Sequence, residues 1–181
     1  MKNIIKSFTI IIFLFLNLCI YAQDSQWRGE NRDGIYNDKG LLQEWPKKGS
    51  ERIFLLEDLG SGYSSPIVKN EIIYISGRRD SIEVLTAVNM DGDILWETLI
   101  GEAWLRSYPD SRCSPTIEND RIYISSSTGN VNCLDLKTGE VIWAVNTHDN
   151  HKAVFGRFGM AESVLLTETA VISTPAGAKT A

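Results

Sequence analysis

The chain has 181 residues, of which 43 % are hydrophobic and 23 % are charged, and its formal net charge is −5. These proportions are typical of a soluble globular protein with one ordinary domain. A net-acidic chain that has no cluster of Lys or Arg argues against nucleic acid or an anionic membrane surface as a partner. We therefore expect neither.

The segment 1–22 has the pattern of a secretory signal peptide. Lys2 and Lys6 precede a short apolar run, and Ala22 stands where a signal peptidase would cleave. The run is short for a membrane span of about 20 residues, so a membrane anchor is the weaker alternative. A lipid anchor at Cys19 is disfavoured because a bulky leucine precedes it. The sequence thus predicts cleavage after Ala22, a periplasmic or secreted protein, and no stable membrane span after cleavage.

Two segments further along the chain are similar to one another. Residues 64–77 read SSPIVKNEIIYISG, and residues 113–126 read CSPTIENDRIYISS. Ser65 corresponds to Ser114, and a third, shorter copy begins within residues 162–174. Internal repeats of about 40 to 50 residues are typical of propellers and other repeat architectures.

Each unit is expected to contain four short strands. In the first unit they are PIV, IIYIS, LTAVN and ILWETL, and in the second PTI, RIYIS, VNCLD and VIWAVN. Several are apolar at successive positions, as in residues 141–145, which indicates a sheet that is covered on both faces. A small four-stranded sheet between similar sheets is a blade of a β-propeller. No stretch after residue 22 has a helical period with caps, so we expect no long helix.

In both units a glycine precedes a tryptophan by four positions, at the turn between the third and fourth strands. Glycine supplies the positive φ that such turns often need, while Asp and Thr side chains can bond to the local backbone. The tryptophan is expected to cover the seam to the next blade, where its indole N–H can find an acceptor. The residues assigned to this structural repeat are Gly92, Trp96, Asp135, Thr138, Gly139 and Trp143.

The segment CLDLKTGEVIW resembles the tryptophan-docking repeat of the pyrroloquinoline-quinone-like, quinoprotein-type β-propeller family, and AVNMDGDILW is a looser copy. WRGENRDGIY and GMAESVLLTETAVISTPAG resemble segments of exported members. The likeness extends from Trp27 to the end of the chain. It implies an all-β propeller of four-stranded antiparallel blades, with about two and a half blades present. The repeat is specific for the fold and says little about activity.

The expected organisation is a signal peptide at 1–22, an N-terminal arm at 23–50 and propeller repeats at 51–181. The blades are placed at about 63–100, 112–147 and 160–181. A closed ring needs roughly four to eight blades. We therefore expect the chain to be the N-terminal part of a longer protein, with the strand ERIFLL completing the last blade and Phe54 near the tryptophan position.

Connections from a fourth strand to the next first strand lie on one side of a propeller. Two of them, 101–112 and 147–162, are longer than a typical connection and carry aromatic and Arg side chains that suit a binding surface. That these loops merely cap the ring is an equal alternative. The sequence does not decide whether residues 27–34 pack across the same end of the propeller as these loops or across the opposite end. The candidate binding face comprises Trp104, Arg106, Tyr108, Arg112, Arg157 and Phe158, with His151 and Phe155 in the same loops.

No catalytic motif is present in the sequence, and no catalytic residue or bound metal is predicted. His148 and His151 form an isolated H-x-x-H that we interpret as solvated loop residues. Cys113 and Cys133 have no zinc spacing. An exported protein could pair them in a disulfide, although two buried thiols are the favoured interpretation.

Three functions are compatible with this sequence. The favoured one is a non-catalytic exported module that binds or scaffolds a protein or polymer ligand, resembling the outer-membrane barrel-assembly propeller proteins, with no cofactor. One alternative is a quinoprotein dehydrogenase that oxidises alcohols or sugars with pyrroloquinoline quinone and calcium. The other is a carbohydrate-handling propeller that uses aromatic loop residues such as Trp104.

Overall fold

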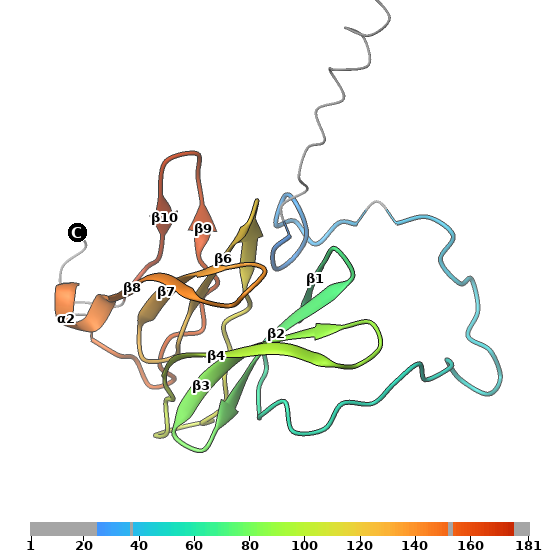
Figure 1. Cartoon of the computed structure of the whole chain (residues 1–181), viewed down its shortest axis with the longest axis horizontal. Helices are drawn as coiled ribbons and strands as arrows, with labels where there is room; N and C mark the ends of the chain where they lie inside the picture. Colours follow the sequence, from blue (N-terminus) through green and yellow to red (C-terminus); the bar gives the residue numbers. More distant parts are fainter. Residues whose placement is uncertain (1–24, 37, 152–153, 176–181) are drawn as a thin grey trace, which may run out of the picture.

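The computed structural model describes residues 25–36, 38–151 and 154–175. The predicted signal peptide lies outside these residues. Within them, no helix is both long enough and apolar enough to cross a membrane. The described chain forms two four-stranded antiparallel sheets, a two-stranded one and a short helix (Figure 1).

The strands follow one another in each sheet without a crossover, in the orders β1-β2-β3-β4 and β5-β6-β7-β8. The first sheet comprises β1 (Ile67–Lys69), β2 (Ile72–Arg79), β3 (Ile82–Asn89) and β4 (Ile94–Glu102). The second comprises β5 (Thr116–Glu118), β6 (Arg121–Ser125), β7 (Asn130–Asp135) and β8 (Val141–Asn146). The short pair is β9 (Leu165–Leu166) with β10 (Val171–Ile172), and it opens the third repeat.

The two large sheets repeat one another in detail. Trp96 pairs across β3–β4 with Ala87, and Trp143 pairs across β7–β8 with Cys133, with a register shift next to each pair. Each tryptophan also lies beside the tyrosine of the second strand. The ring centroids of Trp96 and Tyr74 are 5.9 Å apart, and the corresponding distance in the second sheet is 6.1 Å. The predicted repeat is therefore a structural one.

Local polar contacts shape the turns between third and fourth strands. Asp135 Oδ1 accepts a hydrogen bond from the backbone N–H of Thr138 at 2.8 Å, and this and neighbouring bonds lower the pKa of the Asp135 carboxyl. Asn89 has the same role in the first sheet, where its Oδ1 accepts from the Asp93 N–H at 2.7 Å. The glycine at each turn has a positive φ, 93° at Gly92 and 73° at Gly139.

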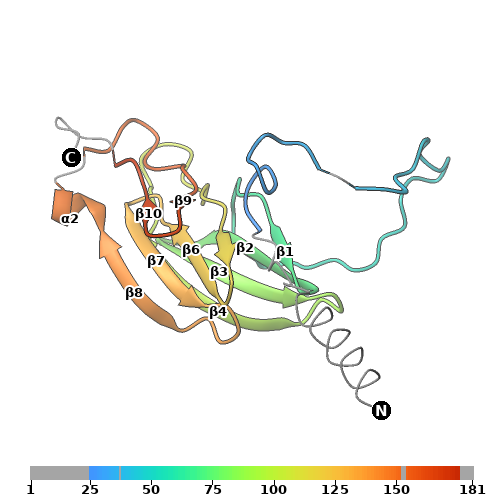
Figure 2. The ribbon, with the colours of Figure 1, turned by 90° about the horizontal axis from the view of Figure 1, so that it is seen from above.

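An apolar core lies between the two large sheets, which sit side by side in Figure 2. Tyr74, Leu85 and Ile100 enter it from the first sheet, and Ile122 and Leu134 enter it from the second. All are at most 1 % exposed, and burial raises the pKa of Tyr74 to about 12. Stacked four-stranded meanders that share such a core are blades, so the protein is all-β and forms part of a β-propeller ring, with two whole blades and the start of a third.

Phe54 lies where a fourth strand from a preceding blade would place an aromatic ring. A Cβ added at Gly92 would meet the Phe54 ring at 3.5 Å, in the same way that the turn of the second blade meets Trp96. No residue of the segment 51–56, which was expected to be a strand, lies in a strand in the structure. The preceding residues 38–50 run as an extended loop away from the sheets (Figures 1 and 2).

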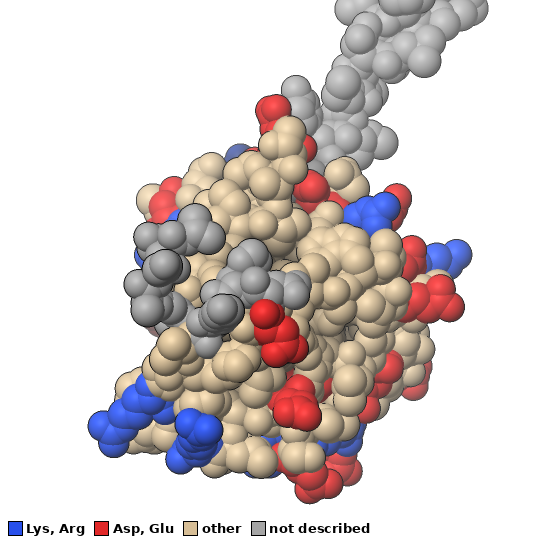
Figure 3. Space-filling view, turned by 90° about the vertical axis from the view of Figure 1, so that its left-hand side faces the viewer, with Lys and Arg blue, Asp and Glu red and all other residues tan. Residues whose placement is uncertain are grey.

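The outer side of the second blade is open. Val141, Ile142, Trp143 and Val145 of β8 are 36 % to 47 % exposed. Uncharged side chains cover most of the face on this side of the molecule, while basic side chains gather at its lower left (Figure 3).

The region expected to be one long loop, 147–162, begins with a short helix. This is α2 (Thr147–His151), which follows β8 directly. Thr147 is buried and donates from its hydroxyl to the Gly129 carbonyl at 2.9 Å, and the Asn146 side chain accepts from the Asp149 N–H at 3.0 Å. This capping of the first turn outweighs the weak helical pattern of THDNH.

Candidate functional site

Arg112 joins the two long loops. Its guanidinium donates to the carbonyls of Ser107, at 2.9 Å, and Tyr108 in the first loop. It also donates to the Phe158 carbonyl in the second loop. A planar group with five N–H donors suits such a junction. Arg112 therefore fixes the two loops against one another, a structural role that the sequence did not reveal.

Trp104 is a second structural member of the predicted face. Its side chain is 6 % exposed, its backbone N–H donates to Ser127 Oγ at 2.8 Å, and its indole N–H donates to Ser107 Oγ at 3.2 Å. The ring of Phe155 packs on it, with centroids 5.5 Å apart. Trp104 is thus an anchor under the loops, and its indole does not face solvent as the carbohydrate alternative requires.

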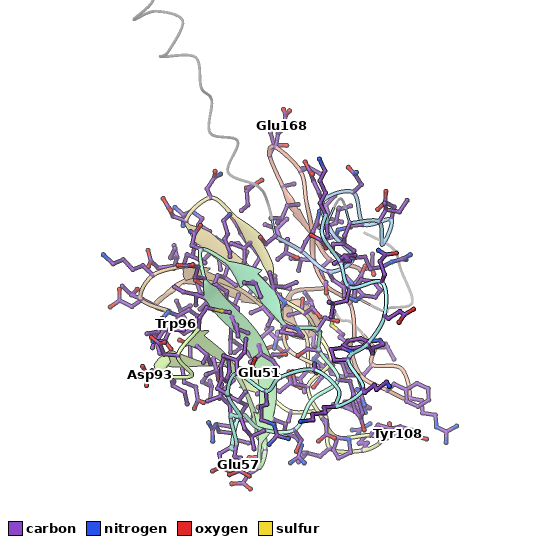
Figure 4. The ribbon with its side chains drawn as sticks, turned by 90° about the vertical axis from the view of Figure 1, so that its right-hand side faces the viewer. Glu51, Glu57, Asp93, Trp96, Tyr108 and Glu168 are labelled. Atoms are coloured by element: carbon purple, nitrogen blue, oxygen red, sulfur yellow. The ribbon has the colours of Figure 1, made fainter. Side chains whose placement is uncertain are left out.

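The remaining four predicted residues form an exposed group on top of this anchor. Tyr108 and Phe158 come from different loops, with ring centroids 5.8 Å apart, and they are 63 % and 47 % exposed. The Arg157 guanidinium lies 5.5 Å from the Phe158 ring centroid, and that of Arg106 lies 5.1 Å from the Trp104 ring centroid. Tyr108 points away from the body of the protein (Figure 4). We call these four residues the loop face.

A buried carboxylate lies below the loops, and sequence reasoning missed it. Glu83 of β3 is fully buried. Its carboxylate accepts from the Ser127 N–H at 3.1 Å and from the Ser127 hydroxyl, and from the Ser111 hydroxyl at 3.4 Å. Burial raises the pKa of Glu83, and these bonds and the charge of Arg112 oppose that effect. A carboxyl inside an apolar strand was the only signal that could have identified it.

Ser127 connects Glu83 to the loops. Its hydroxyl oxygen accepts from the Trp104 N–H and its hydroxyl hydrogen is donated to Glu83. A series of hydrogen bonds therefore connects Trp104 in the first long loop, through Ser127 in the β6–β7 hairpin of the second blade, to Glu83 in β3 of the first blade.

The structure describes the side chain of only one histidine of the H-x-x-H pair, His148. His148 is half-exposed, and its ring stacks on Phe155 at 5.0 Å with an angle of 8° between the planes. Its Nδ1 lies 3.6 Å from Asp149 Oδ1. His151 ends α2, and its side chain lies outside the part of the molecule that the structure describes.

The N-terminal arm packs along the first strand of the second blade. Ser25 forms an antiparallel bridge with Ile117 of β5, through two backbone hydrogen bonds of 3.0 Å and 2.7 Å. Further along the arm, Arg32 donates to the Val164 carbonyl of the third repeat. The side chain of Thr116 donates to the same carbonyl at 3.2 Å. The described part of the arm thus packs on the first strand of the second blade and on the start of the third repeat.

Both described cysteines have free, buried thiols. Cys113 Sγ lies 3.9 Å from the Met160 carbonyl oxygen, and Cys133 Sγ lies 3.9 Å from Arg121 Nη1. Burial raises the pKa of the Cys113 thiol well above its ordinary value.

Calcium beside a quinone, as the dehydrogenase alternative requires, needs several carboxylate and amide oxygens around one ion. Among the described residues, no three His, Cys, Asp or Glu side chains are grouped so that they could hold a metal. Glu83 is surrounded by serine groups. The described residues do not fit this pair of cofactors, and no chemical step is derived through them.

No family model matches the sequence, and no curated protein matches it. Among solved structures, a quinohemoprotein alcohol dehydrogenase from Comamonas testosteroni is similar at 17 % identity over 62 % of this chain, with a TM-score of 0.45. One from Pseudomonas putida HK5 shares 19 % identity over 64 % of this chain, with a TM-score of 0.48. BamB from Moraxella catarrhalis shares 19 % identity over 49 % of this chain, with a TM-score of 0.34.

The chain spans only 16 %, 17 % and 23 % of those three proteins, respectively. The two blades and their shared core, and not these likenesses, establish the fold.

Proposed function

We propose that this chain is part of an exported, non-catalytic propeller that binds a protein or polymer ligand through the loop face. The observation that carries the proposal is the exposed Tyr108–Phe158 pair, flanked by Arg106 and Arg157. Tyr, Phe and Arg are all enriched at protein interfaces, and Tyr and Arg are among the side chains that most often contribute a large share of the binding energy.

Rigidity of the supporting loops favours this role. Arg112 ties the two loops together through backbone carbonyls, and Trp104 anchors the first loop on Ser127. Loops that are already fixed lose little conformational entropy on binding. The two guanidinium groups of the loop face favour a partner that presents acidic groups.

Site-specific photo-crosslinking in the native host tests the proposal. A photo-reactive amino acid replaces Tyr108 in one variant and Tyr36 in a matched control, since these side chains are 63 % and 61 % exposed and only the first belongs to the loop face. We expect a discrete adduct at position 108 alone, and its loss when Arg106 and Arg157 are both replaced by Gln. The same adducts from both positions, or none from position 108, would contradict the proposal.

A dye-reduction assay separates the dehydrogenase alternative. The purified protein is supplied with pyrroloquinoline quinone, calcium, an alcohol or sugar and a dye acceptor. We expect no reduction above a protein-free control. Reduction that depends on protein, quinone and calcium together would overturn the non-catalytic assignment.

A further inference from the structure

A pocket of about 290 Å³ lies where the N-terminal arm meets the starts of three repeats. Ser65, Ser114 and Ser163 hold equivalent places in the three repeats, and all three line it. The Ser114 hydroxyl oxygen accepts from the Ser65 N–H at 2.8 Å, so the first two repeats are joined at this wall. We call this the arm pocket; it does not include Arg106, Tyr108, Arg157 or Phe158.

Two guanidinium groups line the arm pocket, and both are bonded to neutral acceptors. Arg32 donates to the Gln26 side-chain oxygen at 2.6 Å and to the Val164 carbonyl. Arg112 donates only to loop carbonyls in the described structure. Neither residue takes part in any of the ion pairs found among the described residues. The two guanidinium groups therefore form no salt bridge among the described residues, although the charges of Glu162 and Glu83 act on Arg32 and Arg112, respectively.

Among the described residues, Glu162 is the one acidic side chain that lines the arm pocket. Its carboxylate accepts from the Thr174 N–H at 3.1 Å and from the Thr174 hydroxyl. Burial lowers the pKa of Arg32, and the charge of Glu162 only partly opposes that effect. A partly desolvated cation of this kind favours a bound anion, and a guanidinium suits a carboxylate best because it can form two parallel hydrogen bonds.

Two exposed aromatic rings flank the same pocket. Trp27 is 47 % exposed and Tyr63 is 63 % exposed. Flat apolar faces beside a few polar groups are typical of small-ligand sites. With the serine hydroxyls as further donors and acceptors, the wall matches a ligand that has an apolar ring face, several hydroxyl groups and one carboxylate.

We propose that the arm pocket binds a carboxylated sugar residue of an acidic polysaccharide. Arg32 pairs with the sugar carboxylate, Trp27 and Tyr63 lie along the sugar ring, and the repeat serines contact its hydroxyl groups. This site is separate from the loop face and does not depend on the function proposed for it.

Calorimetric titration with defined saccharides tests the site. The probes are a short oligogalacturonate, a neutral oligogalactose of the same length, and acetate. We expect the acidic oligomer to bind at least about tenfold more tightly than the neutral one, since one good charged contact is worth about that factor. Acetate is expected to bind far more weakly than the oligomer, because it lacks the ring and hydroxyl groups. Equal binding of the neutral oligomer, or equal binding of acetate, would overturn the proposal.

Two substitutions with opposite expected effects on oligogalacturonate binding distinguish a lost ligand contact from a misfolded variant. Arg32→Gln is expected to weaken oligogalacturonate binding about tenfold, but it also removes the bond to Val164 and could release the arm. Glu162→Gln removes the repelling charge and keeps an acceptor for Thr174, so it is expected to tighten binding severalfold. Weaker binding by a folded Glu162→Gln variant would contradict the proposal. Arg52→Gln, at an exposed position outside both the pocket lining and the loop face, is expected to leave the binding unchanged.

Discussion

The ring of Trp96 occupies the space that a side chain at Gly139 would need. A Cβ at Gly139 would lie 2.5 Å from Trp96 Cε3. Thr98, on the same strand as Trp96, donates from its hydroxyl to the Gly139 carbonyl at 2.7 Å. No hydrogen bond of the Trp96 indole itself is found within the described residues, so the bond across the seam comes from Thr98 and not, as expected, from the tryptophan. The ring of Trp96 in the first blade thus packs against the turn between the third and fourth strands of the second blade.

Replacement of Gly139 by Ala is expected to destabilise the protein strongly. The left-handed backbone costs about 1 to 2 kcal/mol for a residue with a Cβ, and the clash with the Trp96 ring adds about 1 to 3 kcal/mol. Gly92→Ala is the matched control, because Gly92 also has a positive φ but its nearest neighbour, Phe54, lies at an ordinary 3.5 Å. Denaturant unfolding compares the two variants. Equal losses would mean that the Trp96 contact contributes nothing.

Glu83→Gln is expected to change how stability depends on pH. Burial raises the pKa of Glu83 in the folded state, so the folded protein holds this proton more tightly than the unfolded chain does. The stabilisation that results is complete below the unfolded pKa, near 4.5, and is lost as the pH rises through the higher folded-state pKa. A Gln side chain does not ionise, so the variant does not lose stability in this way as the pH rises. The melting temperature of the variant minus that of the wild type should therefore increase with pH.

Glu102→Gln is the control for that experiment, because Glu102 is exposed and the substitution removes the same charge. Thermal melts from about pH 3 to about pH 8, a range that spans the ionisation of an ordinary carboxyl near about pH 4.3 and extends above it, should show no comparable trend for it. If the difference in melting temperature between Glu83→Gln and the wild type stayed constant with pH, Glu83 would hold the same charge in the folded and the unfolded protein, and the prediction would be wrong.

Arg112→Gln is expected to loosen the two long loops without unfolding the blades. The variant loses bonds to Ser107, Tyr108 and Phe158, so the loops should open more often. Chymotrypsin should then cleave after Phe158, which Gly159 follows, about tenfold faster, which corresponds to about 1.4 kcal/mol of lost loop stability. Arg106→Gln, whose guanidinium lies over Trp104, should leave the cleavage rate unchanged. If the cleavage rate of Arg112→Gln equalled that of the wild type, Arg112 would not be the residue that holds the two loops together.

The thiols of Cys113 and Cys133 are expected to react slowly in the native protein. Both are buried and free, and the raised pKa of Cys113 keeps it protonated and therefore weakly nucleophilic at neutral pH. Iodoacetamide should label both positions only after denaturation, without a reducing agent. Peptide mass spectrometry measures the extent of labelling at each cysteine. Labelling that requires prior reduction would indicate a disulfide.

Much of the fold was predictable because it depends on short-range pattern. Spacing alone placed Trp96 and Trp143 on the fourth strands, and Asp135 with Thr138 at a turn, and the structure confirms these positions. A turn needs a particular φ and nearby acceptors, and both are properties of a few consecutive residues. The helix α2 was missed because its capping residues stand in a segment without helical periodicity.

The candidate site was predictable only as a set of loops. The six residues of the predicted face do come together, yet Trp104 and Arg112 serve the scaffold and leave four side chains exposed. Nothing local distinguishes an Arg that binds carbonyls from one that faces solvent. The partners of Arg112 lie up to 46 positions away along the chain.

The sequence by itself determined the repeating four-strand unit and its turns, because short apolar runs, β-branched residues and turn glycines act within a few positions of one another. The tertiary structure alone decided that Glu83 is buried, that the arm lies along β5, and that Arg32 faces a pocket with Glu162. Burial and charge depend on neighbours that the chain brings from distant repeats, and that proximity exists only once the blades have packed.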